Sequence, residues 1–294
     1  MEYQTTPIIG IQNTATKEAG VRLLVKCEYQ NHPEVSGNKW WKLKYNLEEA
    51  HKRGYKTILT FGGAYSNHIY ATAAATSEAG LQSIGIIRGE KVEPLNNTLT
   101  FAAYKGMQLH FVSRERYRLR NDLSFLKELH QQFGEFYLIP EGGTNELAVK
   151  GCTEFAVTQL SALPFNYLCL PVGTGGTMAG VVCGLTDEKQ ITGIAVLKQG
   201  EFLQNDVSMM IRNFPGKHYG NWQILTSYHH GGYAKVSDEL NRFIVSMKVA
   251  HNLLLDHVYT AKLMWAVMEE IKKGNFPRGS TILALHTGGL QGSS

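Results

Sequence analysis

The sequence lacks the features of a membrane or secreted protein. No apolar run approaches the ~20 residues that span a bilayer, and the first residues, MEYQTTPIIG, lack the charged-then-apolar layout of a secretory signal. Cysteine is scarce, and its spacing fits neither a C-x-x-C motif nor a disulfide framework, so reduced thiols and a cytoplasmic location are expected. The four cysteines are Cys27, Cys152, Cys169 and Cys183.

Motifs for metals and an excess of one charge are also missing. There is no H-E-x-x-H motif, and the side chains of His229 and His230 diverge because the residues are adjacent, so no metal site is expected. The net charge of +4 comes from scattered Lys and Arg. Only the segment 113–120, SRERYRLR, is locally basic, and we interpret it as a solvated helix or loop face. Neither a nucleic-acid nor a membrane partner is expected.

What the sequence does contain is a regular alternation of short apolar runs and helical patterns. The predicted strands are 57–63, 83–89, 107–113, 136–143, 166–176, 191–198 and 281–289. Several of the segments between them open on Ser, Asn or Asp and close on Gly, which are start and stop signals of helices. Continuous apolar strands that alternate with helices indicate parallel sheets covered on both faces. The fold class is therefore α/β.

Several predicted strands end in glycine-rich turns before a helix: FGGAYSNH, PEGGTNE and PVGTGGTMAG. In open α/β sheets, ligands bind beyond the carboxyl ends of strands, where helix N-termini offer free N–H groups to anions. The segment 173–180, GTGGTMAG, suits a phosphate, to which the hydroxyls of Thr174 and Thr177 can donate. It has neither the G-K-[ST] ending of a nucleotide P-loop nor a clean dinucleotide fingerprint. A tight turn without a ligand stays open at this point.

Four motifs in one order are more specific: SGNKWWKL, GGAYSNH, GTGGT and a final HTGG. Together they resemble the fold type II (tryptophan synthase β-like) enzymes that use pyridoxal 5′-phosphate. Within that class, the chain is most similar to the family of 1-aminocyclopropane-1-carboxylate deaminases and D-cysteine desulfhydrases. The likeness runs from TTPI near the start to HTGG near the end. It implies pyridoxal 5′-phosphate as cofactor, a small amino acid as substrate and a homodimer.

The resemblance also implies roles for individual residues. Lys39 would form the Schiff base with the cofactor, because a buried amine loses its proton near neutral pH, and Trp40 or Trp41 would give part of the dry surface around it. Without the resemblance, Lys39 would be a turn lysine beside core tryptophans. Further cofactor contacts are expected from Lys42, Gly173, Thr174, Gly175, Gly176 and Thr177 at the phosphate, and from Asn67 at the ring hydroxyl.

The substrate side of the site is implied in the same way. The turn Ser66-Asn67-His68 would hold the substrate carboxylate, with Ser66 near the α-carbon, although plain capping of a helix by Ser66 is compatible with this. Tyr233 and Tyr259 match tyrosines that face the substrate, and nearby cations could lower their pKa for proton transfer. Taken alone, either tyrosine would be an ordinary core residue.

Two lobes are expected, each an open, mostly parallel sheet with helices on both faces. The smaller lobe would span 43–150 and be inserted into a larger one made of 1–42 and 151–294, with the cofactor between them.

Three functions are compatible with these residues. In the deaminases, a Glu follows the second tyrosine and a Leu stands in the terminal motif, where this chain has Thr260 and Thr287. Neutral hydroxyls at the ring nitrogen make a weaker electron sink, which favours β-elimination from a D-cysteine-like amino acid to give pyruvate, ammonia and sulfide. The alternatives are a 1-aminocyclopropane-1-carboxylate deaminase and a protein that binds the cofactor with little catalysis.

Overall fold

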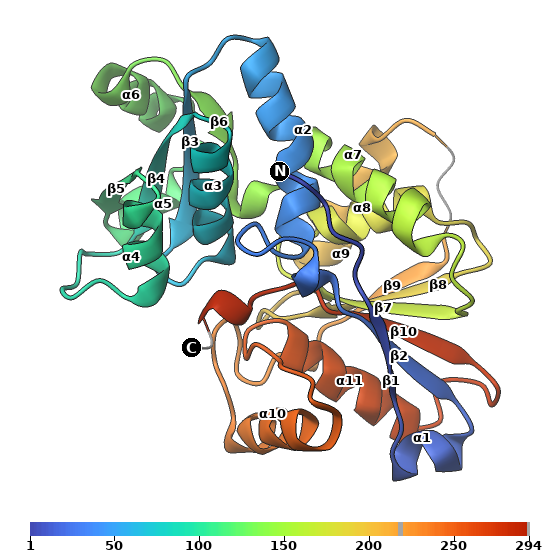
Figure 1. The fold of residues 1–294 in the computed structure, drawn as a ribbon. Coiled ribbons are helices and arrows are strands. Elements are labelled where there is room, and N and C mark those ends of the chain that lie inside the picture. The colour runs from blue at the N-terminus through green and yellow to red at the C-terminus, as the bar shows by residue number, and fades with distance from the viewer. Residues whose placement is uncertain (217–219, 293–294) are drawn as a thin grey trace.

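The computed structural model describes residues 1–216 and 220–292, which form two sheets with helices packed around them (Figure 1). The larger sheet has six strands in the order β1-β2-β10-β7-β8-β9. Only β1 runs antiparallel to its neighbour, and the other pairs are parallel. The strands are β1 (Ile8–Ile11), β2 (Arg22–Lys26), β7 (Tyr167–Val172), β8 (Gln190–Ala195), β9 (Trp222–Leu225) and β10 (Thr281–Leu285).

The smaller sheet is wholly parallel and has the order β5-β4-β3-β6. Its strands are β3 (Thr57–Gly63), β4 (Gln82–Arg88), β5 (Met107–Val112) and β6 (Tyr137–Ile139). The last residues of β3 and β4, Gly63 and Arg88, lie side by side in the register. Both therefore reach the carboxyl edge of this sheet.

The helices cover both faces of the sheets. They are α1 (Thr14–Ala19), α2 (Asn38–Lys52), α3 (Asn67–Glu78), α4 (Asn97–Tyr104), α5 (Arg114–Arg118), α6 (Leu123–Phe133), α7 (Glu146–Phe155), α8 (Gly176–Gly184), α9 (Phe202–Asn213), α10 (Asp238–His251) and α11 (Thr260–Lys272). Short helical turns are η1 (Glu28–Gln30), η2 (Glu141–Gly143), η3 (Ala156–Leu160) and η4 (Leu290–Gly292).

The alternation of side chains along the strands explains the two covered faces. In β7, Leu168 and Leu170 point into the core cluster that contains residues of α2, α7 and α8, whereas Cys169 points to the cluster with α10 and α11. Successive side chains of a strand face opposite sides, so a fully apolar strand needs helices on both. Figure 1 shows these two helical layers above and below the larger sheet. The predicted α/β class with two mostly parallel sheets is confirmed.

Seven of the ten strands match predicted segments, and three were missed. Strand β3 has the predicted bounds, whereas β6 is much shorter than its predicted segment. The missed strands are β1, β2 and β9. The proposed lobe boundaries at 42/43 and 150/151 fall inside α2 and α7, and the division stays a proposal. Within the described residues, no helix combines the length and the apolar character needed to cross a bilayer.

Candidate active site

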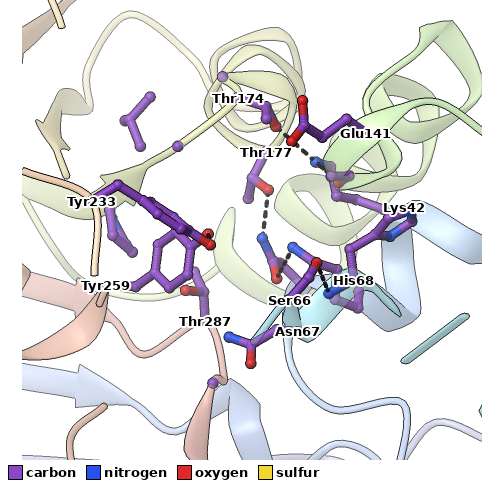
Figure 2. Close-up of a pocket in the computed structure, with 18 of the residues that line it drawn as sticks. Lys42, Ser66, Asn67, His68, Glu141, Thr174, Thr177, Tyr233, Tyr259 and Thr287 are labelled. Carbon is purple, nitrogen blue, oxygen red and sulfur yellow. Dashed lines mark hydrogen bonds between the residues drawn. The ribbon is translucent and has the colours of Figure 1, made fainter. Parts of the chain in front are cut away.

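A cavity of about 550 Å³ lies where the carboxyl ends of the strands of both sheets meet (Figure 2). It draws residues from the ends of β3 and β4, from the loops after β7 and β10, and from the start of α2. Twelve of the fourteen predicted site residues line it: Lys39, Lys42, Ser66, Asn67, His68, Gly173, Thr174, Gly175, Thr177, Tyr233, Tyr259 and Thr287. Gly176 and Thr260 lie behind its wall.

Lys39 stands in the first turn of α2, directly after Gly37 and Asn38. Its Nζ lies 3.3 Å from Asn38 Oδ1. Desolvation by burial lowers the pKa of Lys39 to about 8. A substantial fraction of the amine is therefore neutral near physiological pH, which is the form that attacks an aldehyde.

The backbone before Lys39 is fixed by close contact with the terminal motif. Gly37 has φ +68, and a Cβ there would lie 1.9 Å from the carbonyl oxygen of Thr287. The next residue, Asn38, donates its backbone N–H to that same oxygen over 3.0 Å. Only glycine permits this approach, so the G-N-K motif and the H-T-G-G motif are joined through backbone atoms.

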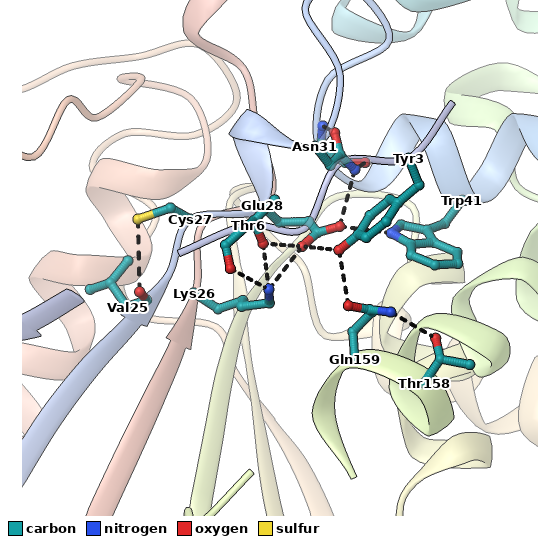
Figure 3. Close-up of polar contacts among 11 residues, drawn as sticks. Tyr3, Thr6, Val25, Lys26, Cys27, Glu28, Asn31, Trp41, Thr158 and Gln159 are labelled. Carbon is teal, nitrogen blue, oxygen red and sulfur yellow. Dashed lines mark hydrogen bonds and ion pairs between the residues drawn. The ribbon is translucent and has the colours of Figure 1, made fainter. Parts of the chain in front are cut away.

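A buried polar network holds this junction from behind (Figure 3). Asn31 accepts the backbone N–H of Gly37 at 2.8 Å and donates to the carbonyl of Gly37 at 2.9 Å. Asn31 also donates to the carboxylate of Glu28, which is 1% exposed and accepts from Trp41 Nε1 at 2.8 Å. The charge of Glu28 is further balanced by Lys26, 3.8 Å away. The network thereby ties the start of α2 to β2.

The two tryptophans do not line the cavity, which corrects the expectation that one of them would face the cofactor. Trp40 and Trp41 pack against each other and against Tyr3, with ring centroids about 5 Å apart. Their indoles belong to the large core cluster. They anchor α2 in the core.

Lys42 lies three residues after Lys39, on the same face of α2. Its Nζ donates to the carbonyl of Gly142 at 2.7 Å and to Thr144 Oγ1 at 2.8 Å, and lies 3.5 Å from Thr174 Oγ1. Lys42 is 2% exposed. Burial, reinforced by the positive charge of Lys39, lowers the pKa of Lys42 to about 7. An anion placed at this end of the cavity would restore the charged form.

The glycine loop after β7 completes an anion cradle next to Lys42. Gly175 has φ +81, and a Cβ there would lie 2.7 Å from Val207. A Cβ on Gly176 would lie 2.9 Å from Thr144 and 3.3 Å from Lys42, so side chains are excluded from this turn. The backbone N–H groups at the start of α8, the hydroxyls of Thr174 and Thr177, and the Lys42 ammonium suit a phosphate group. The residues present fit pyridoxal 5′-phosphate.

The turn Ser66-Asn67-His68 begins α3 as expected. Ser66 caps the helix by accepting the backbone N–H groups of His68 at 3.2 Å and Ile69 at 3.3 Å. The imidazole of His68 is 2% exposed and bonds Thr60 at 2.8 Å. Burial, helped by the charges of Lys39 and Lys42, keeps the pKa of His68 well below its usual range. His68 is therefore a neutral, internally bonded residue at the wall of the cavity.

Tyr233 and Tyr259 face the cavity together, from the side opposite Lys42 and His68 (Figure 2). The hydroxyl of Tyr259 donates to that of Tyr233 over 3.2 Å. The expectation of lowered pKa values is wrong, because burial raises the pKa of both phenols. The pair is suited to donating hydrogen bonds and protons rather than to acting as phenolates.

Thr260 and Thr287 occupy different surroundings. The Thr260 hydroxyl donates to Asp256 Oδ1 at 2.6 Å and is fully buried, so it bonds the protein rather than the cavity. Asp256 also accepts the backbone N–H groups of Val258 and Tyr259, both at 2.8 Å, and so orients Tyr259. Thr287, in contrast, lies at the cavity wall. Asp256 was not among the predicted residues, although an Asp just before a helix is a capping signal.

The sequence interpretation also missed four charged residues of the cavity, Arg88, Arg120, Glu141 and Asp206. Arg120 Nε and Glu141 Oε2 form an ion pair of 2.7 Å. Arg88, Arg120 and Asp206 belong to no motif with a spacing that indicates a site, whereas Glu141 stands in the glycine-rich turn PEGGTNE. Arg88 and Glu141 share one weak sequence signal of a binding site. Each closely follows the apolar core of a strand, at the sheet edge where ligands bind.

Comparisons with known proteins agree with this geometry. A family model described as pyridoxal-phosphate dependent enzyme matches residues 1–288. A Thermotoga maritima protein, named provisionally as a 1-aminocyclopropane-1-carboxylate deaminase, is 30% identical over 99% of this chain and 96% of its own. A mitochondrial Arabidopsis thaliana protein, named as a bifunctional D-cysteine desulfhydrase/1-aminocyclopropane-1-carboxylate deaminase, is 30% identical over 93% of this chain and 73% of its own.

Solved structures give the same result. The crystal structure of an ACC deaminase homologue has a TM-score of 0.85 and 26% identity, covering 99% of this chain and 91% of its own. A hydrogen sulfide-producing enzyme from Fusobacterium nucleatum, at 15% identity, covers 97% of this chain and 96% of its own with a TM-score of 0.69, and shows the shared fold alone. The chain is an enzyme of the fold type II pyridoxal-phosphate class, and it belongs to the family of 1-aminocyclopropane-1-carboxylate deaminases and D-cysteine desulfhydrases.

Proposed function

We propose that this enzyme is a lyase that removes the β-substituent from a D-cysteine-like amino acid and releases pyruvate, ammonia and, from D-cysteine, sulfide. When bound, pyridoxal 5′-phosphate supplies an electron sink for negative charge at the substrate's α-carbon. The protein's contribution is to bind, orient and move protons around that carbon.

Each part of the cavity would bind a different group of the cofactor or the substrate. Lys42, Thr174 and Thr177 would hold the phosphate, and the neutral amine of Lys39 would bind the aldehyde carbon. The N-terminal turn of α3, at Ser66 and Asn67, would hold the substrate carboxylate through helix N–H groups. Tyr259 and Tyr233, protonated and linked to each other at 3.2 Å, would face the departing group as proton donors.

The single observation that carries the choice of lyase is Thr287. It lies at the cavity wall where the resemblance places the ring nitrogen, and its side chain is a neutral hydroxyl. Such a group bonds the nitrogen without fixing a positive charge there, and a thiolate leaves more easily than a ring carbon. The hydroxyl of Thr260 donates to Asp256, so Thr260 is not expected to contact the ring nitrogen directly.

Deamination of 1-aminocyclopropane-1-carboxylate is a second candidate, supported by the names of the Thermotoga and Arabidopsis relatives. Assays of the purified holoenzyme with D-cysteine, L-cysteine, β-chloro-D-alanine and 1-aminocyclopropane-1-carboxylate separate the two. We expect sulfide and pyruvate from D-cysteine and pyruvate from the chloro compound. Release of α-ketobutyrate from the cyclopropane, without products from the others, contradicts the lyase. The homodimer, the cytoplasmic location and the lobe boundaries stay predictions.

A further inference from the structure

The basic segment 113–120 is not only a solvated surface. Tyr117 is 2% exposed, and two guanidinium groups lie over its ring, with Arg88 at 5.6 Å and Arg120 at 5.4 Å from its centroid. Arg88 comes from the end of β4, and Tyr117 and Arg120 come from α5 and the turn after it. Both arginines line the cavity described above.

The charges of these two arginines are balanced differently. Arg120 pairs with Glu141 Oε2 at 2.7 Å, and the Tyr117 hydroxyl donates to Glu141 Oε1 at 2.8 Å, so both oxygens of this carboxylate are engaged. Across residues 1–216 and 220–292, no acidic side chain forms an ion pair with Arg88. Arg88 therefore presents an uncompensated positive charge at the cavity.

Arg88 lines the cavity from the carboxyl edge of the smaller sheet, at the end of β4. It is next to Gly63 in the strand register, and a Cβ on Gly63 would lie 3.4 Å from Arg88 Nη2, so no side chain of β3 screens the guanidinium. Arg88 is also solvent-exposed, as expected at an entrance.

We propose that Arg88 makes the enzyme prefer amino acids whose β-substituent ends in an anionic group, such as a carboxylate or a sulfonate. This inference rests on the proposed lyase function and names its substrate class more narrowly. A guanidinium can donate two parallel hydrogen bonds to two oxygens of such an anion, and the cation–π contact with Tyr117 would hold Arg88 in place. The substrate's own α-carboxylate is bound elsewhere in this proposal, at the start of α3.

The test uses two substrates of nearly equal shape, S-carboxymethyl-cysteine and its neutral amide S-carbamoylmethyl-cysteine, each in the D and L forms. In both, the Cβ–S bond breaks, the sulfur leaves with the bonding electron pair, and the α-proton is lost. Addition of one water gives pyruvate and ammonium together with thioglycolate or its amide. For the wild-type holoenzyme we expect kcat/KM to be roughly tenfold higher for the carboxylate than for the amide. This preference lies in the lower part of the range for charge-assisted hydrogen bonds, because Arg88 is exposed.

The variant Arg88→Gln should abolish this preference, with a loss of kcat/KM of roughly tenfold for the carboxylate and a clearly smaller loss for the amide. Arg116→Gln is the matched control: it removes the same charge from α5, where Arg116 pairs with Glu128 outside the cavity, and should keep the preference. Equal rates for the two wild-type substrates overturn the proposal. An equal loss for both in Arg88→Gln also overturns it, because Arg88 would then bind the α-carboxylate.

A calorimetric comparison separates this proposal from the lyase itself. Dissociation constants of the carboxylate and the amide on Lys39→Ala, with and without Arg88→Gln, measure the preference without turnover. Absence of pyruvate from every substrate contradicts the proposed function, while a carboxylate preference that depends on Arg88 still supports the binding role. Equal dissociation constants for both compounds on Lys39→Ala contradict the binding role of Arg88.

Discussion

At the scale of single residues, Lys42 combines a buried amine with a site built for an anion. Its pKa of about 7 means that the side chain is mostly neutral at pH 8 in the free protein. A phosphate dianion bound against it favours the charged form and raises that pKa, so binding at pH 8 should take up close to one proton, and binding at pH 6 should take up almost none from this residue.

The measurement is isothermal titration calorimetry with pyridoxine 5′-phosphate, which has the phosphate but no aldehyde to react with Lys39. Comparing buffers of different ionisation enthalpy gives the number of protons exchanged. Lys42→Met should bind more weakly and lose the uptake at pH 8. Uptake of the same size in Lys42→Met would place the titrating group elsewhere.

Thr287 gives a second prediction at this scale, because its hydroxyl is the feature on which the lyase proposal depends. Thr287→Val keeps the shape of the side chain and removes the hydroxyl. Since a neutral hydrogen bond contributes about 1 kcal/mol, kcat for elimination should fall roughly three- to tenfold. Thr287→Ser keeps the hydroxyl and should stay near the wild-type rate. Full activity in the Val variant would contradict the assigned role of Thr287.

At the scale of elements, the start of α2 depends on a glycine that touches the terminal motif. Gly37→Ala introduces a Cβ 1.9 Å from a backbone oxygen, in a conformation (φ +68, ψ −141) that is essentially restricted to glycine. We expect a loss of at least ~3 kcal/mol in unfolding free energy and a loss of cofactor absorbance.

Gly54, just beyond the other end of α2, is the matched control. Its φ of +77 is also positive, but a Cβ there has no atom within 4 Å. Gly54→Ala should cost only about 1 kcal/mol and leave cofactor binding intact. Urea unfolding of the two holoenzyme variants measures the difference, and equal losses would show that contact with Thr287 adds nothing to the backbone strain.

The elements also show what local sequence can predict. Strands β3 and β10 are apolar over their whole length and are bounded by turn residues, and both begin at the predicted residue. Strands β1 and β9 lie at the two edges of the larger sheet, and neither strand is continuously buried. Whether such a segment forms a strand depends on its pairing with a neighbouring strand, and a local sequence pattern does not predict that pairing.

The same limit applies to the site. Lys39, Ser66 and Thr174 belong to motifs whose order identifies the family, so sequence was enough to place them together. Arg88 and Glu141 are single charged residues near strand ends, and the three-dimensional structure is needed to show that both line the cavity. Thr260 is the opposite case: its position in the family motif predicts a contact with the cofactor. In the structure its hydroxyl bonds Asp256 and does not reach the cavity.

At the scale of the whole molecule, residues of both sheets pack into one of the apolar clusters, so the sheets do not meet only through a flexible linker. The largest core cluster contains Ile58 and Ile139 from the smaller sheet and Leu170 and Leu283 from the larger one. Helices α2 and α7 pack between them, and both cross the proposed lobe boundaries. Separating the lobes would expose this surface, at a cost of about 25 cal/mol per Å² of apolar area.

The two lobes should therefore unfold together. Differential scanning calorimetry of the holoenzyme should give one transition, with a van't Hoff enthalpy close to the calorimetric enthalpy. Leu170→Ala in the larger sheet and Ile139→Ala in the smaller one should each lower that single transition, by about 2–5 kcal/mol in unfolding free energy. Two resolved transitions, with each substitution moving only its own, would mean that the cavity lies between independently folding domains and that the shared core does not couple them.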